Sequence, residues 1–164
     1  MTMESNAYLS ADIVFNAKPD AIPYNYRISY KVSQLCLIMS ICGWGTGRAC
    51  SLIKLHMISF ALISRDYMKK LIAFAEGENQ TPIVRFDPAV NKALTYAMAY
   101  GFIEQQKVGN FILTDCGKQL SGQILLTDDL MVSETEDLNN LAKKLTETRV
   151  KQLVDMWRDK NAAD

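Results

Sequence analysis

The stretch GFIEQQKVGNFILTDCG, residues 101–117, decides the expected fold. It contains two short runs of apolar and polar residues, and Val108 and Gly109 between them are typical of a turn. These features predict a β-hairpin. Directly after the hairpin, the hydroxyl of Thr114 can accept a hydrogen bond from a free backbone amide and so begin a helix over residues 116–126.

The residues before the hairpin predict four helices. Apolar side chains recur at helical spacing, and a glycine or a capping residue stands near several of the expected ends. Asp87 and Pro88 are typical of the N-cap and first turn of the helix that leads into the hairpin, and Gly101 ends that helix. The four predicted helices cover residues 26–42, 52–63, 64–77 and 87–100.

This order of elements predicts a mainly α fold with a small antiparallel β-hairpin. A helix that runs directly into a hairpin, followed by the step Leu113-Thr114-x-x-Gly117, resembles the end of many bacterial winged-helix domains. In such a hairpin alternating residues bury one face, and the threonine caps the next helix. We therefore expect a winged-helix-like domain plus a C-terminal helix. Such a fold does not by itself define a function.

The expected organisation has three parts: an N-terminal arm (1–25), the winged-helix-like domain (26–126) and the C-terminal helix (127–164). In the last part, Ser133 and Glu136 have the spacing of a capping box, in which hydroxyl and carboxylate each satisfy a free backbone amide. A single helix is therefore expected from Ser133, with an apolar stripe that reaches Trp157 and is broken once near residues 148–149.

The composition is that of one globular domain. Of 164 residues, 49% are apolar and 22% are charged, which argues against a disordered chain. The 18 basic and 18 acidic residues balance, so no overall charge attracts nucleic acid or acidic lipid. Residues 24–76 nevertheless carry seven basic against two acidic residues, a net +5, and residues 127–164 carry six against nine, a net −3. This uneven charge has two interpretations. The charged residues form ordinary solvated faces, or the helices within residues 24–76 contact an acidic partner or a phosphate backbone.

The spacing of the cysteines and the short length of the apolar runs indicate where in the cell the protein is expected. No pair of the four cysteines has the two-residue gap of a redox or zinc motif, so we expect a reduced, cytoplasmic protein. The chain has no basic residue before Lys18, which argues against a secretory signal. Its longest apolar run, residues 35–42, is far shorter than the ~20 residues of a membrane helix. We expect no membrane contact.

Residues for catalysis are few. His56 is the only histidine, and Cys50 precedes it by six residues on a different face of the expected helix, which is poor geometry for a ligand set or a catalytic pair. The glycines in residues 43–47 lack the spacing of a phosphate loop, so we expect a hinge there. We expect a partly buried structural histidine, no catalytic residue, no cofactor and no metal. A small cysteine enzyme that uses Cys50 with His56 is the alternative.

The predicted recognition helix, residues 87–100, offers few groups that read DNA. Base edges and phosphates are contacted by Arg, Lys, Asn and Gln, and this helix supplies Asn91 and Lys92. The hairpin adds glutamines next to Glu104, so the region is only weakly basic. The candidates for nucleic-acid contact are Arg48, Lys54, Lys69, Lys70, Lys92 and Lys107.

Two segments carry a resemblance to a known family. They are SLIKLHMISFAL, residues 51–62, with the glycine joint ahead of it, and VRFDPAVNKAL, residues 84–94. Together with the Leu-Thr-x-x-Gly step, they resemble the small middle subunit of bacterial three-component systems built around an SMC-like ATPase of the ABC type. These include the Lamassu-type systems that defend against phages and plasmids. The resemblance spans residues 26–120 and implies an accessory subunit, because the ATPase and nuclease partners of such systems do the chemistry.

Two functions follow as hypotheses. The first is a non-enzymatic accessory subunit that binds an SMC-like ABC ATPase and helps assemble or regulate an antiviral defence nuclease complex, with DNA contact as an option. The second is a free-standing, homodimeric winged-helix transcriptional regulator. The weakly basic character of residues 87–110 favours the first. Aromatic residues and methionine are common at interfaces as well as in cores, so the partner-binding candidates are Leu55, Met57, Ile58, Phe60, Tyr96, Tyr100 and Trp157.

Overall fold

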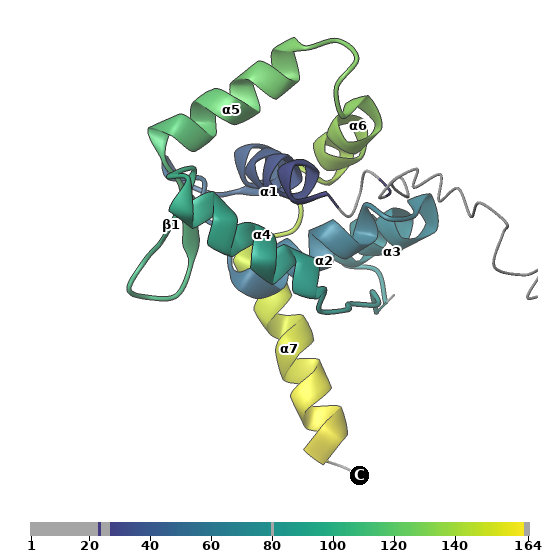
Figure 1. Cartoon of the computed structure of the whole chain (residues 1–164). Coiled ribbons are helices and arrows are strands. Elements are labelled where there is room, and N and C mark those ends of the chain that lie inside the picture. Colours follow the sequence, from purple (N-terminus) through teal and green to yellow (C-terminus); the bar gives the residue numbers. More distant parts are fainter. Residues whose placement is uncertain (1–22, 24–26, 80, 163–164) are drawn as a thin grey trace, which may run out of the picture.

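The computed structural model describes residue 23 and residues 27–79 and 81–162, and Figure 1 shows their arrangement. The elements are α1 (Ile28–Cys42), α2 (Leu52–Ala61), α3 (Arg65–Ala75), α4 (Pro88–Ala99), β1 (Ile103–Gln105), β2 (Phe111–Leu113), α5 (Asp115–Leu126), α6 (Val132–Leu141) and α7 (Glu147–Ala162). The predicted fold class, mainly α with a small antiparallel hairpin, is confirmed. The predicted arm lies outside the described residues, apart from residue 23. No helix in the described ranges has the length and apolar character needed to cross a bilayer.

In the described residues, side chains cap five of the seven helices at their N-termini, four of them in residues 51–114 and the fifth at Thr146 before α7. Ser51, Ser64, Asp87 and Thr114 precede α2, α3, α4 and α5, and each accepts a hydrogen bond from a backbone N–H two or three residues later. Such caps satisfy amides that have no partner inside the helix. The predicted caps at Ser64, Asp87 and Thr114 are confirmed.

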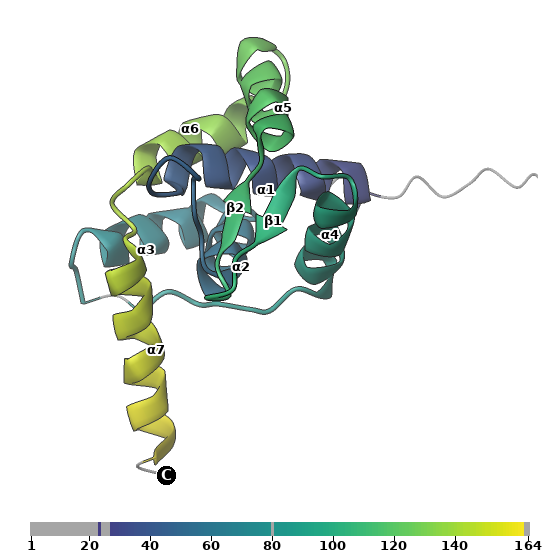
Figure 2. The ribbon, with the colours of Figure 1, turned by 90° about the vertical axis from the view of Figure 1, so that its left-hand side faces the viewer.

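Helix α1 forms the centre of the domain (Figure 2). Helices α2, α4, α5 and α6 and strand β2 all contact it. Its second half is apolar on every face, and Leu35, Leu37 and Ile38 are fully buried. A helix of this kind is stable only when neighbours cover it all round, which is why α1 lies inside the fold.

The hairpin follows α4 directly, as the winged-helix-like order requires. In its antiparallel register Ile103 faces Leu113 and residue 105 faces Phe111. Cys50, just before α2, exchanges two backbone hydrogen bonds of 2.9 Å with Phe111 and so adds a third short extended segment to the hairpin. The chain leaves α4 through Gly101, whose φ of +77° is a conformation that favours glycine.

The Leu-Thr-x-x-Gly step has a physical cause in the structure. The hydroxyl of Thr114 accepts from the N–H of Gly117 at 3.1 Å and donates to the carbonyl of Gly101. A Cβ atom added to Gly117 would lie 2.1 Å from the carbonyl oxygen of Phe102. The step therefore joins the start of α5 to the start of the hairpin, and it leaves no room for a side chain at Gly117.

Residues 127–162 form two helices, so the prediction of one helix from Ser133 is wrong. Helix α6 begins at residue 132, after Met131 in a left-handed conformation with φ +52°, and the capping box does not form. Ser133 instead donates to Glu134 at 3.0 Å, and Glu134 also accepts from the hydroxyl of Tyr30. The break falls at residues 142–146, where Thr146 accepts from the backbone N–H three residues later and begins α7.

Helix α7 is fixed to the domain mainly by its first half, and Trp157 in its second half also packs against the core. The carboxylate of Glu147 accepts from the backbone N–H of Ser51 at 2.9 Å, and Leu153 is fully buried. Arg149 lies over the ring of Phe74, 4.5 Å from its centroid, and donates to the carbonyl of the same residue at 3.0 Å. The second half of α7 projects away from the other helices in both views (Figures 1 and 2).

Candidate functional site

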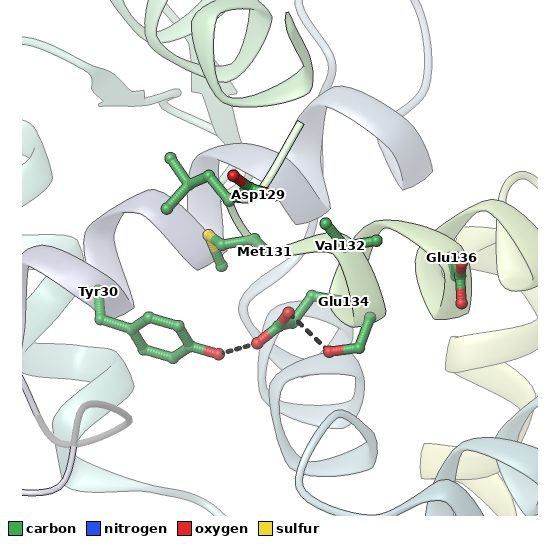
Figure 3. Close-up of a pocket in the computed structure, with 8 residues that line it drawn as sticks. Tyr30, Asp129, Met131, Val132, Glu134 and Glu136 are labelled. Atoms are coloured by element: carbon green, nitrogen blue, oxygen red, sulfur yellow. Dashed lines mark hydrogen bonds between the residues drawn. The ribbon is translucent and has the colours of Figure 1, made fainter. Parts of the chain in front are cut away.

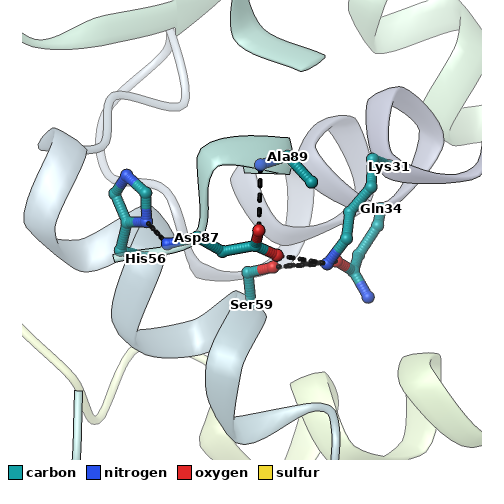
Figure 4. A network of polar contacts seen from close by, with 6 residues as sticks. All are labelled: Lys31, Gln34, His56, Ser59, Asp87 and Ala89. Atoms are coloured by element: carbon teal, nitrogen blue, oxygen red, sulfur yellow. Dashed lines mark hydrogen bonds and ion pairs between the residues drawn. The ribbon is translucent and has the colours of Figure 1, made fainter. Parts of the chain in front are cut away.

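A buried polar network joins α1, α2 and the start of α4 (Figure 4). The ammonium of Lys31 donates to Gln34 Oε1 at 3.3 Å and to Ser59 Oγ at 3.2 Å, and it lies 3.6 Å from Asp87 Oδ2. Ser59 in turn donates to Gln34 at 3.0 Å. Asp87 also accepts from the N–H of Ala89 at 2.9 Å, so one carboxylate caps α4 and pairs with a cation of α1.

Burial sets the electrostatics of this network. Lys31 is 4% exposed, and loss of water lowers the pKa of its ammonium, an effect that the nearby Asp87 carboxylate opposes. An unpaired charge in this position would cost several kcal/mol, on the order of the effective penalty for one buried ion. The contacts to Gln34, Ser59 and Asp87 reduce that cost, and they fix the start of α4 relative to α1.

His56 has both ring nitrogens engaged. Nδ1 accepts from the backbone N–H of Asp87 at 3.2 Å, so Nε2 carries the proton and donates to Asn91 Oδ1 at 3.1 Å. The ring of Phe86 lies against it, with 4.7 Å between centroids. Burial lowers the pKa of the imidazole below its ordinary 6.5. The prediction of a structural histidine fits these contacts, and the ring is fully buried rather than partly buried.

The Cys50 thiol does not form a catalytic pair with His56. Both imidazole nitrogens already bind residues near the start of α4, and burial raises the pKa of the Cys50 thiol to about 12. A thiol that stays protonated at neutral pH is a poor nucleophile. In the part of the chain that the structure describes, no three His, Cys, Asp or Glu side chains gather as metal ligands would.

The prediction of partner binding is wrong for three residues of α2. Leu55, Met57 and Ile58 of α2 are each at most 1% exposed, because α1, α3, α4 and α7 all contact this helix. They belong to the core and cannot meet a partner. Phe60 is half-buried, and its ring stacks on Tyr67 with 4.7 Å between centroids. Trp157 is half-buried on α7.

The remaining two candidates lie together at the C-terminal end of α4, where Tyr100 is the C-cap residue. Tyr96 is 40% exposed and Tyr100 is 69% exposed, and their ring centroids are 6.4 Å apart. A further 6.4 Å separates the ring of Tyr100 from that of Phe102, at the entrance to β1. We call Tyr96, Tyr100 and Phe102 the aromatic surface. Large aromatic side chains in solvent on the helix that would read DNA are typical of a protein-binding face.

Lys54 is not a nucleic-acid contact. It is 2% exposed, and its ammonium donates to the carbonyl oxygen of Cys42 at 2.8 Å, at the C-terminus of α1. A cation there satisfies a carbonyl that has no partner inside the helix and complements the negative end of the helix dipole. The prediction is wrong because this lysine is a helix cap in the interior.

The other basic candidates do not form one face. Lys69 and Lys70 are exposed on α3, Lys92 is exposed on α4 and Lys107 is exposed in the hairpin turn. Arg48 is half-buried in the turn after α1. Helix α3 and the hairpin turn lie on opposite sides of the view in Figure 1. One straight duplex would therefore not contact all of these residues through a single surface.

Sequence reasoning misses the members of the buried network. The available signal is the pair Lys31 and Gln34, which are three residues apart in a largely apolar helix and so share one of its faces. Two polar side chains on a buried face predict a polar partner, because polar groups without one are costly to bury. The sequence predicts Asp87 as a cap only, whereas the structure adds its contact with Lys31.

Comparisons with known proteins supply no family for this chain: no family model, no curated protein and no solved structure matches it.

Proposed function

We propose that the chain is a non-enzymatic accessory subunit that docks on a larger protein through the aromatic surface. The observation that carries the proposal is the row of Tyr96 on α4, Tyr100 at its C-cap and Phe102 just before β1, with two of the three rings exposed to solvent. A helix that reads DNA presents cations and amides, whereas α4 offers Lys92 as its only charged side chain. The polar network at the other end of α4 pairs the start of this helix with α1.

The partner that we propose is an SMC-like ABC ATPase. The resemblance of residues 26–120 to the middle subunit of bacterial three-component systems supports this choice. In that role the chain helps assemble or regulate an anti-phage or anti-plasmid nuclease complex in the cytoplasm. Lys92 is exposed on α4, and Lys107 is exposed in the hairpin turn. They are the residues through which the complex would contact DNA.

Truncation of the tyrosines tests the proposal. Interface tyrosines at hot spots contribute about 2 kcal/mol or more, and 2 kcal/mol corresponds to about a 30-fold change in affinity. Candidate ATPase and nuclease subunits are taken from the genes that flank its own gene, purified, and titrated with the chain in a calorimeter. We expect the ATPase to bind, and Tyr96→Ala with Tyr100→Ala to weaken binding about 30-fold or more. The control Val108→Ser, at a position 80% exposed in the hairpin turn, retains wild-type affinity.

The alternative function, a homodimeric transcriptional regulator, is tested by two parallel measurements. Light scattering of the isolated chain gives its oligomeric state, and fluorescence anisotropy gives its affinity for palindromic DNA duplexes. A stable homodimer that binds a duplex at sub-micromolar affinity, with no loss in the tyrosine variant, overturns the accessory role. A monomer whose ATPase binding depends on the tyrosines supports it.

A further inference from the structure

A groove separate from the aromatic surface lies where α1 meets the connection between α5 and α6 (Figure 3). Its volume is about 620 Å³, and it is lined by Tyr30 and by residues 129–134 and 136. The hydroxyl of Tyr30 donates to Glu134, which also accepts from Ser133, so these three side chains form a connected wall. We call this feature the acidic groove.

Apolar side chains in the groove are exposed to solvent. Leu130 and Val132 line it and are each 46% exposed, while Met131 between them is 8% exposed. Leu126 lies at the end of α5, a few residues before the groove, and is 85% exposed. The groove is shallow and open to solvent, and exposed apolar side chains that gather on such a surface are typical of a place where another protein binds.

The charged side chains that line the groove are all acidic, whereas Lys31 and Arg85 lie in the adjoining pocket that shares Tyr30 and Glu134. Residues 127–142 contain five acidic residues and no lysine or arginine. Asp129 and Glu136 belong to the lining, and both are exposed. Charges of one sign around a concave site raise the local concentration of ligands of the opposite sign. This field repels phosphate groups, which disfavours nucleic acid as the occupant.

We propose that the acidic groove binds a short cationic and apolar segment of a partner protein. Its apolar side chains pack on Leu130 and Val132, and its lysine or arginine side chains face Asp129 and Glu136. Charge complementarity carries the choice of occupant. The chain's own residues 1–26 do not match it, because they hold three acidic residues and one basic residue.

This proposal is independent of the proposed function. The acidic groove shares no residue with the aromatic surface, so either one can fail without the other. If both hold, the chain contacts two different protein segments and links them.

An NMR titration of the ¹⁵N-labelled chain tests the proposal with three synthetic peptides as probes. The first is amphipathic and built from lysine and leucine, the second replaces every lysine by glutamate, and the third replaces every leucine by serine. We expect the lysine–leucine peptide to bind and to shift amides of residues 127–136. We expect the glutamate–leucine peptide not to bind, and the lysine–serine peptide to bind about tenfold more weakly or worse.

Two double variants separate the apolar from the charged contribution. Leu130→Ser with Val132→Ser removes the apolar floor, and Asp129→Asn with Glu136→Gln removes charge at exposed positions. Each is expected to weaken the lysine–leucine peptide about tenfold, with an unchanged circular dichroism spectrum. Val108→Ser is the control for surface changes, and Tyr96→Ala with Tyr100→Ala is expected to leave peptide binding unchanged.

Four results of the peptide titrations would overturn the proposal. They are shifts confined to residues away from Tyr30 and 127–136, equal binding of the lysine–serine peptide, binding of the glutamate–leucine peptide in the groove, and full affinity in both double variants. Concentration-dependent shifts of residues 127–136 in the absence of peptide would assign the groove to a second copy of the chain, which also contradicts it.

Discussion

Replacement of Asp87 tests whether the buried network fixes the start of α4. Asp87→Ala removes the cap of α4, which typically contributes about 1 kcal/mol. It also removes the carboxylate 3.6 Å from the Lys31 ammonium, and because the Asp87 side chain is 34% exposed we discount this contact to about 1 kcal/mol. Lys31 keeps its hydrogen bonds to Gln34 and Ser59, so the charge retains partners. The expected loss in unfolding free energy is about 2 kcal/mol.

Urea unfolding measured by circular dichroism gives this quantity. With a slope of about 2 kcal/mol per molar urea, the midpoint of Asp87→Ala should fall by about 1 M. Asp87→Asn keeps a good capping residue and loses only the charge, so its midpoint should fall by about 0.5 M. In a Lys31→Met background, Asp87→Asn should cost less than it does in the wild type, because the ion pair is already absent.

Equal midpoints for the alanine and asparagine variants would refute the role of the cap. An Asp87→Asn cost that is the same in the wild type and in Lys31→Met would refute the ion pair. A loss below about 0.5 kcal/mol for Asp87→Ala would place the change in the range of ordinary surface substitutions and would contradict the whole account of the network.

Three further predictions concern single residues, each measured by urea unfolding. Gly117→Ala places a Cβ atom 2.1 Å from the Phe102 carbonyl oxygen and should cost about 3 kcal/mol, whereas Gly122→Ala, a helical position with open space around it, should stabilise by about 0.5–1 kcal/mol; similar values for the two would contradict the close approach. Burial lowers the pKa of His56, so the unfolded chain takes up a proton first as the pH falls below 6.5. As the pH falls in that window, the free energy of unfolding of the wild type should decrease by up to about 1.4 kcal/mol per pH unit more than that of His56→Gln. Parallel pH profiles for the two proteins would contradict the lowered pKa of His56. Lys54→Met leaves a carbonyl at the end of α1 without its cation and should cost about 1–3 kcal/mol; an unchanged midpoint would show that the cap contributes nothing.

The sequence predicts local structure well wherever a cap or a glycine marks a boundary. Ser64, Asp87 and Thr114 accept from backbone amides at the expected helix starts, and Gly77 and Gly101 adopt positive φ just after α3 and α4. These signals act within a few residues, so the neighbouring sequence is enough to recognise them.

Predictions fail where distant contacts decide. Ser133 and Glu136 have the spacing of a capping box, yet Glu134 binds Tyr30 from 104 residues away and α6 begins one residue earlier. The apolar run of α2 is compatible with core or interface, and only the packing of α1, α3, α4 and α7 assigns Leu55 to the core. Lys54 carries the charge of a surface residue, and its carbonyl partner on α1 could not be predicted from spacing.

Part of the candidate site could likewise be predicted from the sequence, and part could not. Tyr96 and Tyr100 can be recognised in the sequence because they stand four positions apart and so share one face of the predicted helix. The network of Lys31, Ser59 and Asp87 is not visible, because its members lie 28 or more residues apart along the chain.

Hydrogen–deuterium exchange on the chain with and without the proposed ATPase partner tests the central claim most directly, because it maps any contact on the wild-type chain. The account predicts that binding slows exchange at residues 96–102, the second half of α4 and the entrance to β1. Unchanged exchange there, with protection confined to α3 or to the hairpin turn, would contradict docking through the aromatic surface.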